Sequence, residues 1–373
     1  FVEMQNEKGE TVLHIACKTT SDVVKSLLSG LTNLQKFELM KKKDVDGKTA
    51  IFWACSWRSD RHELHALLFE DMDRDQKFDL FNVPSENGFS PLIQICRNAK
   101  CDYNGFLKTL FSELDSLQVE ELLTQRTSKD ETALHWVIAY LPSLVSVLFE
   151  KMNSAQRVSL LLMKSYNEEF QSRISLFQFA CSCSRNNDAH FKLVQSLLGY
   201  FDNDVHNLKK VLECTDDMGR TVLHQETIHN DERLVRFIMS WYKKVGKSKH
   251  FVMKSDYNNM SALHESFVLA NENKTGLLCY YRELLSKVVF NQEVTAFFEK
   301  RAFSSKITVS EPLLIVISEE VMASKDLSPI QKIKIAQRYC LSNGRNIIMW
   351  ACLLKNLDLL QQLFKEMDPF KKQ

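Results

Sequence analysis

Apolar and polar positions alternate along this chain in blocks that begin in nearly the same way. A turn residue is followed by threonine, and apolar residues then recur at helical spacing, as in "GETVLHIACK" from Gly9 and "DETALHWVIAY" from Asp130. Apolar residues at positions i, i+3 and i+4 are typical of amphipathic helices. The pattern therefore predicts short helices separated by turns.

The blocks recur with a drifting period of about 40 residues. When they are aligned on their threonine or serine, the anchor positions are Thr11, Thr49, Ser90, Thr132, Ser175, Thr221, Ser261, Glu311 and Asn346. The residue two positions after each anchor is apolar. Such a period indicates stacked supersecondary units. We therefore expect one array over residues 1–373, with units that start near residues 7, 45, 86, 128, 171, 217, 257, 308 and 342.

Each block carries signals for a turn and two helices. Glycines such as Gly47 and Gly88 lie two residues before the anchor, where a turn needs positive φ. The anchor hydroxyl suits a helix N-cap. A second apolar pair, such as Leu27-Leu28, follows within another helical pattern. The predicted unit is turn, helix, turn, helix.

The connections between units are long and have their own pattern. Residues 31–43, 72–83, 114–125 and 152–164 are each apolar at helical spacing with a glutamine in the middle. This pattern predicts an extra short helix in several connections.

The motif T-A-L-H after a turn, followed by a helix with a V-x-x-L-L pattern, resembles the ankyrin repeat over almost the whole chain. The resemblance implies an all-α solenoid of about nine helix-turn-helix units. Ankyrin units run to about 33 residues, so these units are longer. Long-repeat arrays of this style resemble those of effector proteins that intracellular bacteria inject into host cells.

Charge and hydrophobicity argue against several classes of protein. The chain has 48 Lys and Arg against 47 Asp and Glu, a net charge of +1, which disfavours a nucleic-acid-binding protein. No apolar run approaches the roughly 20 residues that span a membrane, so we expect no membrane insertion. The start at Phe1 lacks the features of a signal peptide. We therefore expect a processed or truncated piece of a longer protein.

Five of the ten cysteines lie six residues after their anchors: Cys17, Cys55, Cys96, Cys181 and Cys352. Free cysteine behaves as a small apolar residue, so core packing is the favoured interpretation. The remaining cysteines lack zinc-ligand spacing. We expect no metal and no cofactor, and a reducing compartment, the cytoplasm.

Four histidines occupy the fourth motif position: His14, His135, His224 and His264. The resemblance implies that each imidazole hydrogen-bonds the turn. A catalytic Cys–His pair would occur once, not as a repeat, so we expect no enzymatic activity. Glu226 lies where the repeat normally has alanine. We expect it either to be exposed locally or to pair with a neighbouring unit, since a lone buried carboxylate is costly.

Aromatic residues gather four and eight positions after the anchors, on the side of the first helix opposite the core. The resemblance places this side in a concave groove. The predicted partner-binding residues are Trp53, Trp57, Trp136, Tyr140, Phe179 and Trp350. Exposed aromatic side chains mark contact surfaces. The alternative is that the extra helices bury them.

The sequence thus predicts a protein–protein interaction module that binds a partner protein through the groove and the turn tips. No phosphate-binding loop, nucleophile elbow or metal motif occurs. The alternative is a targeting region of a larger enzyme, or of a secreted bacterial effector acting in the host cytosol, whose catalytic domain lies outside this chain.

Overall fold

The computed structural model describes residues 2–56, 62–70, 72–97, 104–185, 187–271 and 276–285, together with residues 307–308 and 339–340. The predicted units near 308 and 342, and the predicted site residues Trp57 and Trp350, lie outside these residues. The chain divides into two compact units, residues 1–217 and residues 218–373.

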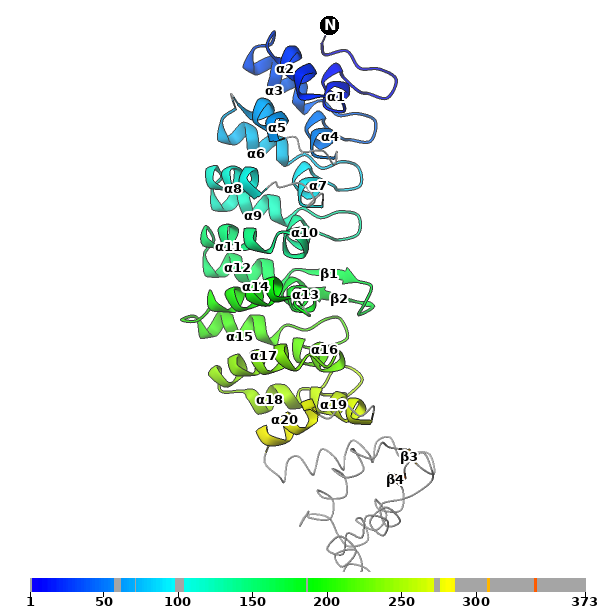
Figure 1. Cartoon of the computed structure of the whole chain (residues 1–373), viewed down its shortest axis with the longest axis vertical. Coiled ribbons are helices and arrows are strands. Elements are labelled where there is room, and N and C mark those ends of the chain that lie inside the picture. Colours follow the sequence, from blue (N-terminus) through cyan, green and yellow to red (C-terminus); the bar gives the residue numbers. More distant parts are fainter. Residues whose placement is uncertain are drawn as a thin grey trace, which may run out of the picture. The chain divides into compact units, whose positions relative to one another are not determined.

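The first unit consists of repeats of three helices each. The first helices are α1 (Val12–Ala16), α4 (Ala50–Ser56), α7 (Pro91–Arg97), α10 (Ala133–Tyr140) and α13 (Leu176–Cys183). The second helices are α2 (Ser21–Leu28), α5 (His62–Phe69), α8 (Asn104–Glu113), α11 (Pro142–Glu150) and α14 (Asp188–Gly199). The third helices are α3 (Asn33–Lys41), α6 (Arg74–Phe81), α9 (Ser116–Thr124), α12 (Ser154–Leu162) and α15 (Val205–Glu213). Within this unit the first helices follow one side and the other two sets the opposite side (Figure 1).

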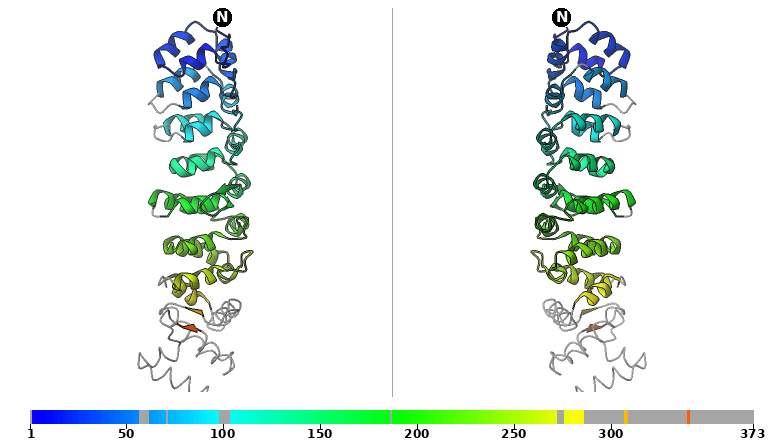
Figure 2. Two further views of the ribbon diagram at one scale, coloured as in Figure 1. Left: turned by 90° about the vertical axis from the view of Figure 1, so that its right-hand side faces the viewer. Right: turned by 90° about the vertical axis from the view of Figure 1, so that its left-hand side faces the viewer.

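Helices of the same kind in successive repeats pack against one another. Helix α10 packs between α7 and α13, α11 packs on α14, and α12 packs on α15. Side views of residues 1–217 show each repeat as one layer (Figure 2). The residues two positions after the anchors form the core of these layers, and Leu13, Ile51, Leu92, Leu134 and Phe177 are all fully buried. The predicted arrangement of core positions is thus confirmed in the first unit.

The four predicted extra helices are confirmed as α3, α6, α9 and α12. Their central glutamine is the third helical residue of a capping box, in which its side chain accepts from the backbone of the N-cap residue. The N-cap residues are Thr32, Asp73, Asp115 and Asn153. Helix α15 was not predicted, because its N-cap Asp204 is followed by Asn207 at the third helical position in place of glutamine.

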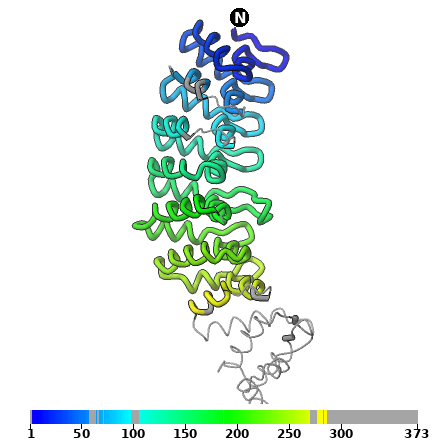
Figure 3. The backbone as a smooth tube through the Cα atoms, viewed as in Figure 1, coloured from blue at the N-terminus to red at the C-terminus, as the bar shows by residue number. Residues whose placement is uncertain are grey.

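The segment between a third helix and the next first helix forms a hairpin-like turn, which we call a finger. The first-unit fingers lie near residues 6–10, 43–49, 85–90, 126–132 and 164–175. Neighbouring fingers are joined by main-chain hydrogen bonds, such as Glu86 N to Asp46 O at 3.1 Å and Ser128 N to Asn87 O at 2.9 Å. Figure 3 shows the fingers beyond the first helices of this unit.

The finger at residues 164–175 differs from the others because it forms two strands. Strands β1 (Lys164–Asn167) and β2 (Ser172–Ser175) pair antiparallel, with Ser165 opposite Ile174. Gln171, at φ 47°, closes the turn. The all-α prediction holds for a mostly helical chain but missed this hairpin, which has no glycine to signal its turn.

The second unit begins with the same three-helix pattern. It contains α16 (Val222–Ile228), α17 (Glu232–Lys244), α18 (Ser248–Met253), α19 (Ala262–Asn271) and α20 (Gly276–Leu284). A short parallel pair follows, β3 (Ile307–Thr308) with β4 (Tyr339–Cys340). Tyr242 stacks on Phe251 with ring centroids 3.9 Å apart. Across the described parts of both units, every helix falls short of the length and hydrophobicity needed to cross a bilayer.

Candidate functional site

An aromatic pair on α10 is the centre of the candidate site. Trp136 and Tyr140 are one helical turn apart, so they lie on the same face of the helix. Their ring centroids are 5.8 Å apart and the ring planes differ by 10°. Trp136 is half-buried, and Tyr140 remains 55% exposed. The pair therefore forms an aromatic surface that solvent reaches.

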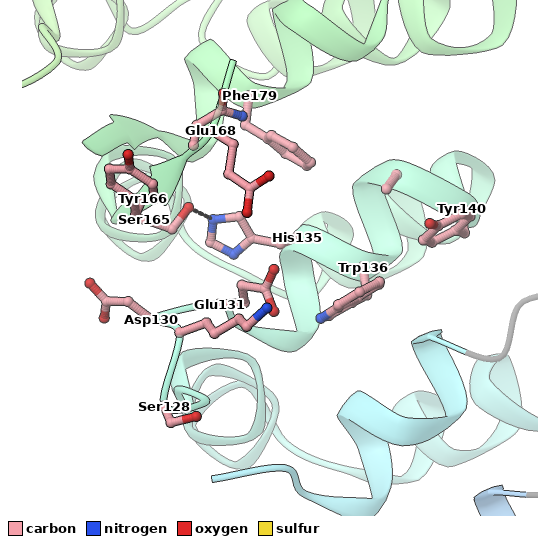
Figure 4. A pocket seen from close by; sticks show the side chains of 13 residues that line it. Ser128, Asp130, Glu131, His135, Trp136, Tyr140, Ser165, Tyr166, Glu168 and Phe179 are labelled. Atoms are coloured by element: carbon pink, nitrogen blue, oxygen red, sulfur yellow. Dashed lines mark hydrogen bonds between the residues drawn. The ribbon is translucent and has the colours of Figure 1, made fainter. Parts of the chain in front are cut away.

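The pair borders a cavity of about 680 Å³, which we call the α10–α13 cavity. Its walls are α10, Phe179 of α13, and residues 128–131 and 165–168 from the two adjacent fingers. Figure 4 shows the side chains of Glu131, His135 and Glu168 around the same space. The ring of Phe179 lies 5.4 Å from that of His135, measured between centroids. The structure thus brings the predicted residues Trp136, Tyr140 and Phe179 together.

Acidic residues from both fingers line the cavity. Asp130 is neutralised, since it forms ion pairs with Arg126, at 2.6 Å, and with Arg173. Glu131 and Glu168 form no ion pair with any residue that the structure describes. The cavity therefore presents two carboxylates whose charge is not compensated by a direct partner there.

The cavity also has one basic lining residue and one unsatisfied donor. Lys129, at the tip of the finger 126–132, is exposed and lines the cavity. The Nε1 nitrogen of Trp136 is shielded from solvent and has no acceptor among the described residues. A buried N–H without an acceptor is unusual in folded proteins.

The indole ring of Trp136 already contacts one cation of this chain. Arg97 of α7 lies over the ring of Trp136, with its Cζ atom 5.6 Å from the ring centroid. Helix α7 packs on α10 on the side away from α13 (Figure 1). Guanidinium groups are attracted to the negative face of an aromatic ring. Arg97 therefore contacts the ring of Trp136 from within the chain, and Trp136 also lines the cavity.

Ser165 and His135 form a close hydrogen bond in the cavity wall but cannot act as a nucleophile and base. The backbone N–H of Thr132 donates to Nδ1 of His135 at 3.0 Å, so Nδ1 has no proton. The neutral ring therefore carries its proton on Nε2, which faces Ser165. An Nε2–H group cannot accept the hydroxyl proton. Burial, the largest cause, lowers the pKa of His135 to about 3, which keeps the ring neutral.

The same arrangement recurs at other fourth-position histidines, as the sequence predicted. Nδ1 of His14 accepts from Thr11 N at 3.1 Å, and Nδ1 of His224 accepts from Thr221 N at 3.2 Å. Ser261 N donates in the same way to His264 at 3.2 Å. These imidazoles cap their own helices.

Trp53 occupies a different environment from Trp136. Its Nε1 donates to Asp44 Oδ2 at 2.8 Å, in the finger that precedes α4. The ammonium groups of Lys18 and Lys48 lie 3.8 Å and 4.8 Å from the indole ring centroid. The polar atom and the ring of Trp53 are thus engaged within the chain. Trp57 and Trp350, the other predicted tryptophans, lie outside the described residues.

The candidate core residues behave as predicted where the structure describes them. Cys17, Cys55, Cys96 and Cys181 are fully buried. Burial raises the pKa of Cys96 to about 12, so its thiol stays protonated. Glu226 is also fully buried, which excludes the exposed alternative.

The sequence did not single out Glu131, Ser165, Tyr166 and Glu168 as site residues. Their signal is weak because finger residues follow no periodic pattern. Among the described residues, no group of three or more His, Cys, Asp or Glu side chains is placed to hold a metal ion.

Comparisons with known proteins match a repeat family over part of the chain. A family model described as "Ankyrin repeats (3 copies)" matches residues 2–77. No curated protein matches the chain. Similar solved structures include the ankyrin repeat domain of Bcl-3, at 16% identity and a TM-score of 0.42, covering 69% of this chain and 94% of that one.

A second similar structure is a chain from the complex of a predatory endopeptidase of Bdellovibrio bacteriovorus with an immunity protein. It has 16% identity and a TM-score of 0.41, and the match covers 63% of this chain and 98% of that one. The family model matches residues 2–77, and the following repeats have the same finger, capped first helix and second helix. The chain contains ankyrin repeats, which the family model matches over residues 2–77, and its repeats are lengthened by a third helix.

Proposed function

We propose that this chain is a protein–protein interaction module that holds a partner protein against the first helices and fingers around the α10–α13 cavity. Ankyrin arrays present extended surfaces of this kind for binding, and the fold is typically non-enzymatic. The observation that carries the proposal is the stacked pair of Trp136 and Tyr140, open to a cavity with two carboxylates that have no ion-pair partner in the described chain.

The composition of the cavity supports this role. Tyrosine and tryptophan are enriched among residues that dominate binding energy, because they bury a large area and lose few rotamers. Tyr140 and Tyr166 are each 55% exposed and border the same cavity from a helix and a finger. A partner that fills the cavity would cover both rings. Trp53 contributes less to binding in this proposal, since its polar atom already has a partner.

Site-specific photo-cross-linking tests the proposal. The photoreactive residue benzoylphenylalanine replaces Tyr140 or Tyr166 in the chain, and irradiation in cell extract should give one discrete covalent adduct from either position. Leu117 of α9 provides the control, since it is 71% exposed and lies on a third helix. Irradiation from position 117 should give no such adduct.

The variant Trp136→Ala tests whether the partner binds at the cavity. Combined with the photoreactive residue at position 140, it should abolish the adduct while far-UV circular dichroism stays unchanged. An adduct that persists in Trp136→Ala, or that forms equally from position 117, would contradict binding at this cavity.

The alternative role, recruitment for a larger enzyme or a secreted bacterial effector, would use the same surface. This role requires a catalytic domain encoded outside this chain, so the full-length coding sequence tests it. The cysteines whose side chains are described are thiols, which supports a reducing compartment such as the cytoplasm.

A further inference from the structure

We propose that the α10–α13 cavity binds the arginine side chain of an extended segment of the partner protein. The inference rests on the proposed function and adds the chemistry of the ligand. Three features of the cavity lead to it. Two acidic side chains come from different fingers, aromatic side chains such as Trp136 and Tyr140 form one wall, and Lys129 is the one lysine or arginine in the lining.

The two carboxylates are placed to share one cation. Glu131 comes from the finger 126–132 and Glu168 from the turn of the β1–β2 finger, and both line the cavity. Figure 4 shows their side chains directed into the same space beside His135. His135 is neutral, so it does not compensate their charge. Lys129 is the one lysine or arginine that lines the cavity, whereas Arg126 and Arg173 pair with Asp130.

The aromatic wall favours a guanidinium over an ammonium group. A guanidinium is planar, so it can lie on a ring while its N–H groups reach carboxylates at its edge. This chain already uses such contacts: Arg97 lies over Trp136 at 5.6 Å and Arg185 over Phe170 at 5.3 Å. A ligand arginine would meet the same chemistry from the cavity side of α10.

The position of the fingers favours an extended ligand. Two fingers contribute to the cavity lining, which also includes the exposed side chains of Tyr140 and Tyr166. Main chain on either side of the arginine would pass over these rings. Lys129 is the cation that competes for the carboxylates before the ligand arrives.

The test uses the full chain and the tripeptide acetyl-Gly-Arg-Gly-amide as the probe. The chain has five tryptophans, so incorporation of 5-fluorotryptophan gives few fluorine NMR signals, and Trp136→Phe assigns the one at the cavity. The probe should shift the Trp136 signal in a saturable way. The peptide with citrulline, a neutral side chain of the same shape, should bind at least about tenfold more weakly, since hydrogen bonds to charged groups are lost.

Variants identify the residues that bind the probe. Glu131→Gln and Glu168→Gln should each weaken probe binding by about fivefold or more. Lys129→Ala should strengthen it, because the competing cation is removed. Glu169→Gln is the matched control: Glu169 is adjacent in sequence but pairs with Arg185 at 2.5 Å outside the cavity lining, so binding should not change.

Equal binding of the citrulline peptide, or a Trp136 signal that does not respond to the arginine peptide, would overturn the assignment of arginine. If the photo-adduct at position 140 still depends on Trp136 in that case, the interaction function stands and only the ligand chemistry is wrong. If the adduct is absent as well, the proposed function itself fails.

Discussion

Nε2 of His224 lies 3.1 Å from the main-chain oxygen of Met260 in the next repeat. Nδ1 of the same ring accepts from Thr221 N, so Nε2 carries the proton and donates to that oxygen. Nε2 of His14 lies 3.2 Å from Lys48 O in the same way. A histidine of this type therefore caps its own helix and joins it to the following finger, provided that the ring is neutral.

The stability of the chain should consequently decrease in mild acid. The pKa values of His14, His135 and His224 are all lowered, chiefly by burial. In the unfolded chain a histidine has a pKa of about 6.5. Between the folded pKa and about pH 6.5, the unfolded state binds more protons than the folded state. The contribution of these histidines to stability is therefore complete above about pH 6.5 and is lost as the pH falls. For His135 the loss continues to about pH 3.

Urea unfolding between pH 7.5 and pH 5 measures this effect. In the acidic part of this range His135 should contribute a slope that approaches about 1.4 kcal/mol per pH unit. His135→Gln should reduce the slope, whereas replacement of the exposed His206 by glutamine should leave it unchanged. Equal slopes for the two variants would show that the buried ring is not the source.

The glutamine of a third helix should stabilise the array in two ways. Gln156 completes the capping box of α12, and its Nε2 also donates to Glu120 of the preceding third helix at 2.8 Å. Gln35 completes the capping box of α3 with Thr32. Both Gln→Ala changes should cost about 1 kcal/mol for the cap. Gln156→Ala should cost about 0.5–1.5 kcal/mol more, the contribution of a cross-repeat hydrogen bond. Denaturant unfolding compares them, and equal losses would contradict that contribution.

Gly88 should not tolerate a side chain. Its φ is +76°, and a Cβ atom would lie 2.4 Å from the main-chain oxygen of Arg126. Left-handed backbone alone costs a non-glycine residue about 1–2 kcal/mol, and the contact adds to this. Gly88→Ala should therefore lower the unfolding free energy by more than about 2 kcal/mol. Gly30→Ala, where nothing lies within 4 Å, should change it little, and a similar loss at both positions would refute the steric explanation.

Trp53 and Tyr140 should differ in their effect on stability although the sequence grouped them. Trp53→Phe removes the hydrogen bond to Asp44 and should cost about 1–2 kcal/mol. Tyr140→Phe keeps the stacked ring at an exposed position and should stay within about 0.5 kcal/mol of the parent chain. Thermal or urea unfolding measures both. Little change in Trp53→Phe would mean that Trp53 is as available for a partner as Tyr140.

Thiol labelling should separate core cysteines from exposed ones. Burial raises the pKa of Cys55 and Cys96, and both side chains are inaccessible. Iodoacetamide should therefore modify the exposed Cys279 in the native chain and reach Cys55 and Cys96 only after denaturation. Mass spectrometry of tryptic peptides reads out the sites. Native-state labelling of Cys55 would contradict its place in the core.

Much of the fold follows from short patterns in the sequence. The apolar position after each anchor, the small buried cysteines and the capping histidines each recur, so each is supported several times along the chain. The extra helices were predicted from apolar spacing around a glutamine, and the structure explains that glutamine as part of a capping box. The strands β1 and β2 were missed because a single occurrence gives no repeat and Gln171 is an unusual residue at positive φ.

The candidate site was predictable only on its helical side. Trp136, Tyr140 and Phe179 follow from helix periodicity, and the structure places them at one cavity. Glu131 and Glu168 belong to fingers, whose side-chain directions depend on how each turn packs on its neighbour. The difference between Trp53 and Trp136 arises from contacts of Trp53 with Asp44 and Lys18, which are not among the aromatic positions four and eight residues after the anchors.

The main-chain hydrogen bonds between neighbouring fingers have a mechanical consequence. Two such bonds are Val45 N to Lys8 O and Ser128 N to Asn87 O. Because of them, the tip of one finger moves together with the tip of the next. These bonds fix the spacing between the tips of neighbouring fingers. If a partner polypeptide binds across the fingers as proposed, this fixed spacing would select among ligands by the distance between their anchoring side chains as well as by charge.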